Sequence, residues 1–222
     1  MTLIELLNID CMEYMATQAD NAFDLAIVDP PYGINIASKS KLSGTSSKEY
    51  TIKNWDAATP NSKYFNELRR VSLNQIVWGV NYFDGEGLFG GAIVWNKLGT
   101  HIGRRNPMPT LSDCEIAYCS MRTNVKMFSY TQIGNVYGND YQIDWKQTRI
   151  HPTQKPIQLY SWLLETYADS NQKVLDTHLG SGSSAIAAHY FGCNFVGCEI
   201  DKDYYEAATK RFNNETRQKA MF

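Results

Sequence analysis

The glycine-rich stretch that begins at Gly180, together with Glu199, has residue types and a spacing that could bind a nucleotide. Gly180, Gly182 and Ala185 fit the pattern G-x-G-x-x-G/A, and Glu199 follows 19 positions after Gly180. Glycines let the backbone turn tightly and approach a ligand, and an acid at the end of the next strand accepts hydrogen bonds from ribose hydroxyls. The pattern predicts a nucleoside-containing cofactor, the alternative being a tight strand-to-helix turn without a ligand.

A second stretch, Asp29-Pro30-Pro31-Tyr32, follows a short apolar run at residues 25–28 that predicts a buried strand. The two prolines cannot donate ladder hydrogen bonds, and they keep Asp29 out of a helical conformation. The stretch therefore puts a carboxylate, a stiff backbone and an aromatic ring at the end of a core strand. Ordinary turn chemistry with a packed tyrosine would also explain it, so a functional interpretation needs support from elsewhere in the chain.

The order of the two stretches bears on the choice of cofactor. A dinucleotide enzyme usually carries the glycine unit near its N-terminus, followed by a substrate domain. Here the glycine unit lies close to the C-terminal end of the sequence. The substrate chemistry is therefore expected upstream, where Asp29 and Tyr32 lie.

Four segments in this order resemble the DNA amino-methyltransferases: DPPY (29–32), HPTQKP (151–156), VLDTHLGSGSS (174–184) and VGCEIDKDYYEAATKRF (196–212). The resemblance is to the permuted β group, in which the catalytic motif precedes the S-adenosylmethionine motif, and to its short phage- or prophage-type members. It spans nearly the whole chain. It implies a doubly wound α/β fold with a mostly parallel sheet, of the Rossmann-like S-adenosylmethionine-dependent methyltransferase type. The implied activity is site-specific methylation of the exocyclic amine of a base flipped out of duplex DNA.

The resemblance assigns roles to the first motif. The target amine is a poor nucleophile because its lone pair is delocalised into the ring. Asp29 and the carbonyl of Pro30 would accept its two N–H groups, and such preorganised acceptors stabilise the charge that develops in the transition state. Pro31 would stiffen the acceptor pair, and Tyr32 would stack on the flipped base. Because the motif begins with Asp, we expect adenine N6 as the target, with cytosine N4 as the nearest alternative.

The resemblance also implies a set of cofactor-binding residues: Asp10, Thr153, Gln154, Lys155, Asp176, His178, Gly180, Gly182 and Glu199. Glu199 would hold the ribose and Asp10 the adenine amine, and the methionine part would lie against Asp176, Gly180 and Gly182. Residues 153–155 would lie near the cofactor carboxylate at a helix N-terminus, which favours an anion; the alternative for Lys155 is a solvated lysine. His178 stands where the family usually has phenylalanine, and it would either stack on the cofactor or pack as a neutral core histidine.

The charge distribution points to a polyanionic partner. The net charge of the 222 residues is −2, but residues 1–32 carry six acids and no Lys or Arg, whereas residues 33–156 carry 15 basic and nine acidic residues. A basic middle between acidic ends suits a DNA-facing surface, although lysine-rich solvated loops would look the same. The basic residues expected to contact duplex DNA are Lys39, Lys41, Arg104, Arg105, Arg122, Lys126, Lys146 and Arg149.

One methyltransferase domain is expected over residues 1–222. Residues 33–60 show little periodicity and predict a long mobile loop that serves the target, and residues 99–150 would form a reduced target-recognition region. This is little surface against the roughly 1,000–2,500 Å² buried by specific DNA complexes. Either the recognition site is short, or another subunit contributes, and a homodimer is the form of assembly we favour.

The elements that must position these motifs follow from hydrophobic periodicity. Strands are predicted at residues 2–10, 23–29, 75–80 and 91–96, and a further strand pair at 114–120 and 125–130. Helices are predicted at 11–16, 62–71, 153–168 (with Pro156 in the first turn) and 204–213, and residues 173–201 read as strand, glycine turn, helix and strand. Strands that alternate with helices predict an α/β sandwich.

Several other classes of protein are disfavoured. No apolar run is long enough to cross a bilayer, and five cysteines without C-x-x-C spacing indicate reduced thiols and no zinc site. His101 and His151 lack partners at metal-ligand spacing, so we expect no metal, no membrane association and a cytoplasmic location in a bacterial or phage-infected cell. An RNA methyltransferase usually has the opposite motif order. The intact motifs disfavour a non-catalytic DNA-binding module, and the lack of a substrate domain disfavours a nicotinamide oxidoreductase.

Overall fold

The computed structural model of this chain describes residues 2–39, 49–98, 112–133, 136–138 and 149–217. Four basic residues predicted to contact DNA lie outside the described residues: Lys41, Arg104, Arg105 and Lys146. Parts of the predicted loop 33–60 and of the predicted recognition region 99–150 lie outside them as well. Within the described ranges, none of the helices combines the length and the apolar character needed to cross a membrane.

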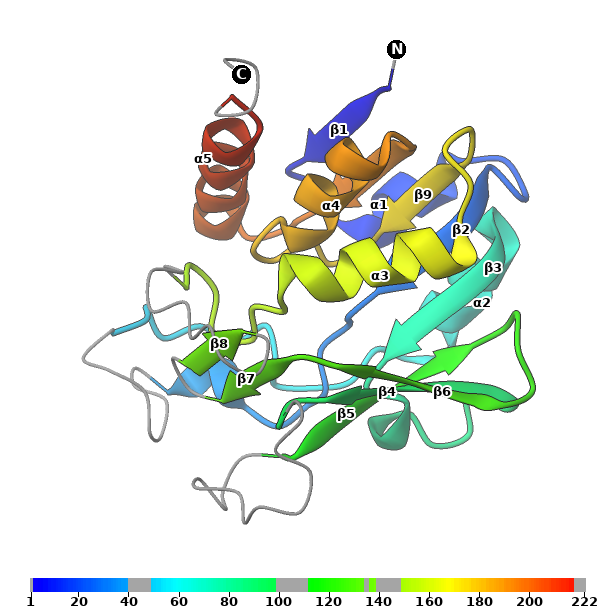
Figure 1. The fold of residues 1–222 in the computed structure, drawn as a ribbon, viewed down its shortest axis with the longest axis horizontal. Coiled ribbons are helices and arrows are strands. Elements are labelled where there is room, and N and C mark those ends of the chain that lie inside the picture. Colours follow the sequence, from blue (N-terminus) through cyan, green and yellow to red (C-terminus); the bar gives the residue numbers. More distant parts are fainter. Residues whose placement is uncertain (1, 40–48, 99–111, 134–135, 139–148, 218–222) are drawn as a thin grey trace.

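Eight strands of the described chain form one sheet in the order β1-β10-β9-β2-β3-β5-β4-β6 (Figure 1). Their bounds are β1 Ile4–Leu7, β2 Phe23–Val28, β3 Ser72–Trp78, β4 Gly91–Asn96, β5 Cys114–Cys119, β6 Val125–Ser129, β9 Lys173–Asp176 and β10 Asn194–Cys198. All neighbours from β1 to β3 are parallel, and β5 is antiparallel to both β3 and β4. β7 (Thr131–Ile133) and β8 (Val136–Gly138) form a separate antiparallel pair. The predicted α/β fold with a mostly parallel sheet is confirmed.

Helices cover both faces of the sheet. One face carries α3 (Ile157–Tyr167), α4 (Ser183–Phe191) and α5 (Lys202–Arg217), and the other carries α1 (Cys11–Ala16) and α2 (Ser62–Val71) (Figure 1). The apolar run of β2 follows from this arrangement. Leu25 and Ile27 belong to the core under α3 to α5, whereas Ala26 and Val28 belong to the core under α1 and α2. A strand covered on both sides needs apolar residues at consecutive positions.

The two motifs meet where the strand order reverses. From β9 the chain proceeds through α4 to β10 on one side, and from β2 it proceeds through α2 to β3 on the other. β9 and β2 are parallel neighbours, so their carboxyl ends lie side by side. Ligands of open α/β sheets bind in the crevice at such a reversal. The fold therefore brings the glycine loop after β9 next to Asp29 after β2.

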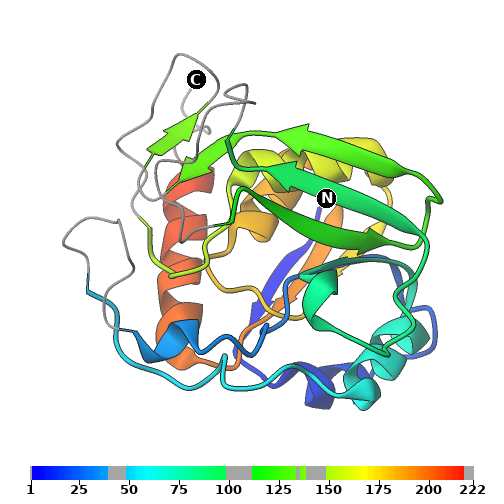
Figure 2. The same ribbon diagram turned by 90° about the horizontal axis from the view of Figure 1, so that it is seen from below.

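Several predicted elements differ from the structure, including the strands predicted at 2–10 and 75–80, which are Ile4–Leu7 and Ser72–Trp78. The strands β5 and β6 exist, but they do not pair with each other, because β4 lies between them and pairs with both; the green strands β4 to β6 are nearest the viewer in Figure 2. Helix α3 begins at Ile157 instead of 153, with Pro156 as an extended N-cap residue at φ −70° and ψ 145°. A proline disfavours the helical conformation of the residue before it, so the helix cannot include Lys155 or the residues before it. Helix α5 is longer than predicted and ends at Arg217.

Candidate active site

A cavity of about 320 Å³ lies at the carboxyl ends of β2, β9 and β10. We call it the glycine-loop cavity. Its lining joins the acids after β2 and β10 to the glycine loop after β9, which are far apart in the sequence. Its lining residues are Asp10, Cys11, Asp29, Pro31, Trp55, His151, Thr153, Gln154, Lys155, Tyr160, Thr177, His178, Leu179, Gly180, Ser181, Cys198, Glu199 and Ile200.

Glu199 is fixed in this cavity by backbone donors. Its Oε2 accepts the N–H of Gly180 at 2.9 Å, and its Oε1 accepts the N–H of Asp201 at 2.9 Å. Gly180 has φ +53°, a conformation that glycine adopts readily. Burial raises the pKa of Glu199, while the two N–H bonds oppose that rise. Each carboxylate oxygen has a second lone pair, so the group can accept hydrogen bonds from a diol as well.

The other residues predicted to bind a cofactor divide into two groups. Asp10, His178 and residues 153–155 line the glycine-loop cavity. Asp10 also caps α1, because its Oδ1 accepts the N–H of Met12 at 2.7 Å. Asp176 and Gly182 are not among the lining residues. The carboxylate of Asp176 is 1% exposed and accepts the hydroxyl of Ser184 at 2.6 Å.

The glycine and the two histidines near this cavity have specific surroundings. Gly182, at φ +73°, packs on α5, since a Cβ there would lie 3.3 Å from that of Ala208. Burial lowers the pKa of His178 to about 4. Burial and the charge of Lys155 together lower the pKa of His151 to about 3. Both imidazoles are therefore neutral at pH 7. His178 contacts the ring of Tyr64 with centroids 5.5 Å apart, which agrees with the packed-histidine alternative.

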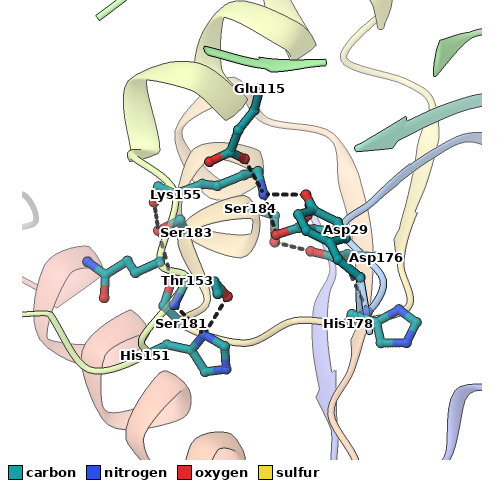
Figure 3. Close-up of polar contacts among 12 residues, drawn as sticks. Asp29, Glu115, His151, Thr153, Lys155, Asp176, His178, Ser181, Ser183 and Ser184 are labelled. Atoms are coloured by element: carbon teal, nitrogen blue, oxygen red, sulfur yellow. Dashed lines mark hydrogen bonds and ion pairs between the residues drawn. The ribbon is translucent and has the colours of Figure 1, made fainter. Parts of the chain in front are cut away.

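Both carboxylate oxygens of Asp29 are engaged by partners within the chain (Figure 3). The hydroxyl of Tyr32 donates to Oδ1 at 2.5 Å, and the ammonium of Lys155 forms an ion pair with Oδ2. The side chain of Lys155 is only 3% exposed, so the interpretation as a solvated lysine was wrong. Burial raises the pKa of Asp29, although the charge of Lys155 opposes this. Burial would lower the pKa of Lys155, but Asp29 and Glu115 outweigh it and raise that pKa.

A larger cavity of about 680 Å³ lies on the other side of residues 153–155, which line both. We call it the tyrosine cavity, because Tyr32 and Tyr82 line it with their rings stacked 4.8 Å apart at 11°. Gly79 also lines it, and a Cβ there would lie 2.1 Å from a ring carbon of Tyr32, so the ring needs a glycine at this place. Besides Lys155, three basic residues line the cavity: Lys39, Lys97 and Arg149.

Residues 122–210 match the N6_N4_Mtase family model, described as DNA methylase. The Type II methyltransferase M2.MboI of Moraxella bovis is 24% identical over 243 residues, covering 93% of this chain and 86% of its own length. The Type II methyltransferase M.HinfI of Haemophilus influenzae is 24% identical over 246 residues, covering 91% of this chain and 66% of its own. The resemblance to the DNA amino-methyltransferases is confirmed.

Two solved structures share the fold. The M1.HpyAVI–SAM complex has a TM-score of 0.57 and 19% identity, covering 95% of this chain and 100% of its own. The cytosine-N4-specific PvuII DNA methyltransferase has a TM-score of 0.57 and 12% identity, covering 98% of this chain and 93% of its own. The predicted fold of the S-adenosylmethionine-dependent methyltransferase type is therefore confirmed. The family match contains the glycine unit and HPTQKP but not residues 29–32.

Glu115 is a residue of the site that the motifs did not reveal. It lies on β5, where its Oε2 is 3.1 Å from Nζ of Lys155 (Figure 3). Its Oε1 is 3.0 Å from Nζ of Lys97. Burial would raise the pKa of Glu115, but Lys155 and Lys97 lower it to about 2. A carboxylate on an otherwise apolar strand, CEIAYC, was the sequence signal that could have found it.

Asp56 and its neighbours are a second group that the motifs did not reveal. The carboxylate of Asp56 is 1% exposed and accepts the backbone N–H groups of Tyr32 at 2.8 Å, Gly33 at 3.0 Å and Ile36 at 2.9 Å. Trp55 lines the glycine-loop cavity with its ring 5.0 Å from that of His151. The described end of the predicted loop 33–60 is thus attached to the site. Its NWD sequence within a polar stretch was the available signal.

The predicted DNA contacts do not all lie near the two cavities. Arg122 follows β5 at the end where Cys119 pairs with Gly91, which is opposite to the end where Cys114 pairs with Asn96. Cys114 lines the tyrosine cavity, so Arg122 lies at the far edge of the sheet. Lys126, on the outermost strand β6, lines neither cavity. Lys39 and Arg149 therefore line the same cavity as Tyr32, whereas Arg122 and Lys126 do not.

Proposed function

We propose that this protein is a site-specific DNA methyltransferase that methylates the N6 amine of adenine, using S-adenosylmethionine and a base flipped out of duplex DNA. The observation that carries the proposal is the shared cavity of Asp29, Gly180 and Glu199. A nucleotide-binding loop and a carboxylate on a rigid Pro-Pro segment then lie within reach of one bound molecule. The proposal places the whole activity in a single domain of residues 1–222.

The residues around the glycine-loop cavity fit S-adenosylmethionine. Glu199 offers free lone pairs to ribose hydroxyls, and the Gly180 turn lets the backbone come close to a ligand. Asp10, Ile200 and Trp55 line the same cavity and provide polar and apolar surface for an adenine. The volume lies within the range of about 300–1,000 Å³ that small-molecule sites occupy. When bound, this cofactor supplies an electrophilic methyl group.

Asp29 acts on the amine that receives the methyl group. Its carboxylate and the carbonyl of Pro30 would accept the two N–H groups and so orient the nitrogen lone pair toward the methyl group that bound S-adenosylmethionine would supply. Tyr32 and Lys155 already occupy one lone pair of each Asp29 oxygen, so the target amine must use a remaining lone pair or replace one of these donors. Because burial raises the pKa of Asp29, this carboxylate is also a suitable acceptor for the proton that the methylated amine loses.

The tyrosine cavity is the proposed place of the flipped base. Tyr32 reaches this cavity from the catalytic motif, and the aromatic rings of Tyr82 and Trp95 line it. Base stacking on such rings is favourable by about 1–3 kcal/mol per base. Lys39 and Arg149 at the same cavity provide phosphate contacts, and residues 99–150 and the loop 33–60 are proposed to form the rest of the DNA-recognising surface. We also propose that two copies of the chain form a homodimer, which would enlarge the surface that contacts DNA.

The preference for adenine rests on the leading Asp of the catalytic motif. The cytosine-N4-specific PvuII enzyme has the same fold, which favours cytosine N4 as the second candidate. Both amines offer two N–H groups to Asp29 and Pro30. The chemistry at the acceptor pair is therefore the same for either base.

Sequencing DNA from cells that express the protein, with detection of modified bases, tests the function and the base together. Expression of the wild type should produce N6-methyladenine in one sequence context, and Asp29→Ala should produce none. In vitro, Asp29→Asn should lower single-turnover methyl transfer by about 10²–10³-fold, as the loss of one preorganised polar group does elsewhere. N4-methylcytosine would establish the alternative target, and normal transfer by Asp29→Ala would contradict the mechanism.

A further inference from the structure

Four charged side chains of alternating sign form a row that ends at the catalytic carboxylate. Asp29 follows β2, Lys155 precedes α3, Glu115 lies on β5 and Lys97 follows β4 (Figure 3 shows the first three). Lys155 contacts both acids, and Glu115 contacts both lysines, at 3.1 Å and 3.0 Å. The row thus connects the proposed chemistry to two strands that contribute no residue of the sequence motifs.

Lys155 is held in this row at both of its ends. Its backbone carbonyl accepts the hydroxyl of Ser183 at the start of α4, at 2.8 Å. Its ammonium has three hydrogens, and the three oxygen partners in reach are Asp29 Oδ2, Glu115 Oε2 and the hydroxyl of Tyr32 at 3.3 Å. Glu115 is therefore the carboxylate that competes with Asp29 for the ammonium.

This competition matters for the proposed reaction, because the target amine needs an oxygen of Asp29. Positive charge develops on that amine during methyl transfer, and a nearby ammonium that is balanced by Asp29 alone would oppose it. A second carboxylate offsets the ammonium and gives it another partner. Without Glu115, Lys155 would bind Asp29 more tightly and hold the oxygen that the amine must reach.

We propose that Glu115 is a positioning residue for methyl transfer: it holds Lys155 so that Asp29 can exchange an internal hydrogen bond for one from the target amine. The proposal rests on the proposed function. In this proposal Glu115 acts through Lys155, and it is not among the residues that line the glycine-loop cavity. Its side chain is 23% exposed in the tyrosine cavity, so substitution there leaves the buried core in place.

The test measures single-turnover methyl transfer by Glu115→Gln, Lys155→Met and the double variant. The substrate is duplex DNA that contains the sequence identified by mapping modified bases. Glu115→Gln should lower the rate constant by about a hundredfold, the loss that a displacement of ~1 Å at a catalytic group produces. The affinity of Glu115→Gln for S-adenosylmethionine, measured by calorimetry, should equal that of the wild type. Glu115→Asp, which keeps the charge, should recover part of the rate.

The double variant separates the proposed role from a general structural one. Once Lys155 is absent, Glu115 has no ammonium to hold, so the double variant should transfer at the rate of Lys155→Met alone. Glu67→Gln is a matched control, since Glu67 forms an ion pair with Arg70 on α2, away from both cavities. It should transfer at the wild-type rate.

The pH dependence gives a further readout. The titratable groups that interact with Asp29 include Lys155, Glu115 and Tyr32 as well as Asp176, Tyr64 and Tyr160, and the charge of Glu115 raises the pKa of Asp29. Glu115→Gln should therefore shift the acid limb of the rate profile to lower pH. The proposal would be overturned if Glu115→Gln had the rate constant and the pH profile of the wild type. It would also be overturned if the fold-loss in rate of the double variant were the product of the fold-losses of the two single variants. A wild-type protein that methylates no DNA would instead contradict the proposed function itself.

Discussion

Asp56 Oδ1 accepts the backbone N–H of Tyr32 at 2.8 Å, although the two residues are 24 positions apart. The same segment reaches the other side of the site, because Nζ of Lys53 lies 2.6 Å from Asp201, whose N–H is bound by Glu199. The residues from 53 to 56 therefore join the catalytic motif to the loop that follows β10. This connection gives the loop a structural role besides the proposed DNA contact.

Asp56→Ala should destabilise the protein and slow methyl transfer. Three backbone N–H groups lose their acceptor, and each buried donor without a partner costs about 1–3 kcal/mol. Urea unfolding measures the stability. Asp56→Asn keeps one acceptor oxygen, so its free energy of unfolding should lie between those of the wild type and Asp56→Ala. Asp84→Asn, at an exposed turn, is the control. Unchanged unfolding of Asp56→Ala would mean that water replaces the carboxylate.

Tyr32→Ala should weaken the binding of the target base, since stacking contributes about 1–3 kcal/mol per base. Tyr32→Phe keeps the ring against Tyr82 but removes the hydroxyl that donates to Asp29. It should retain much of the activity. Parallel assays of single-turnover transfer decide between ring and hydroxyl: if Tyr32→Phe is as inactive as Tyr32→Ala, the stacking role is wrong.

Glu199→Ala should weaken S-adenosylmethionine binding by about 1.5–3 kcal/mol, because the ribose hydroxyls lose a charged acceptor. Glu199→Gln should weaken it less, since the amide oxygen can still accept one of the N–H bonds from Gly180 and Asp201. Isothermal calorimetry with the cofactor provides the numbers, and Glu206→Ala, on the exposed face of α5, serves as the control. Equal affinity for wild type and Glu199→Ala would remove this residue from the site.

Acidification should destabilise the wild type partly through His151. Burial, with Lys155, lowers the pKa of His151 from its ordinary 6.5 to about 3. Between these values the unfolded chain binds a proton that the folded protein does not, so stability falls as pH falls, by up to about 1.4 kcal/mol per pH unit. Asp176, whose pKa burial raises to about 7, acts in the opposite direction.

The contribution of His151 is isolated by His151→Asn, which retains an acceptor near Nδ1 but does not titrate. Urea unfolding at pH 7.5, 6.0 and 5.0 should show a smaller loss of stability on acidification for the variant than for the wild type, because Asp176 is common to both. Parallel losses in the two proteins would mean that His151 is protonated in the folded state.

Lys39→Ala combined with Arg149→Ala should weaken DNA binding and reduce the slope of log affinity against log salt by up to about two, if both residues contact phosphates. The double variant Arg122→Ala and Lys126→Ala removes the same charge at the far edge of the sheet, and it should leave the slope unchanged. Fluorescence anisotropy with a duplex over a salt series measures both. A larger effect of the second pair would place DNA on the opposite edge.

The sequence by itself determined the motifs, their order and most of the elements. Helices 11–16 and 62–71 and strand 91–96 have the predicted bounds, because apolar spacing and capping act within a few residues. Asp29, Gly180 and Glu199 could be singled out for the same reason: their chemistry depends on residue types at short separations. The prediction of an α/β sheet followed from the alternation of strands and helices.

Only the tertiary structure decided which distant residues meet. The insertion of β4 between β5 and β6 and the adjacency of β2 and β9 depend on strand order, which local periodicity does not encode. Strand order also put the ammonium of Lys155 between Asp29 and Glu115, where the sequence alone allowed a solvated lysine or a cofactor contact. A buried charge is stable only with its partners. Those partners lie on separate strands, so the folded sheet had to supply them.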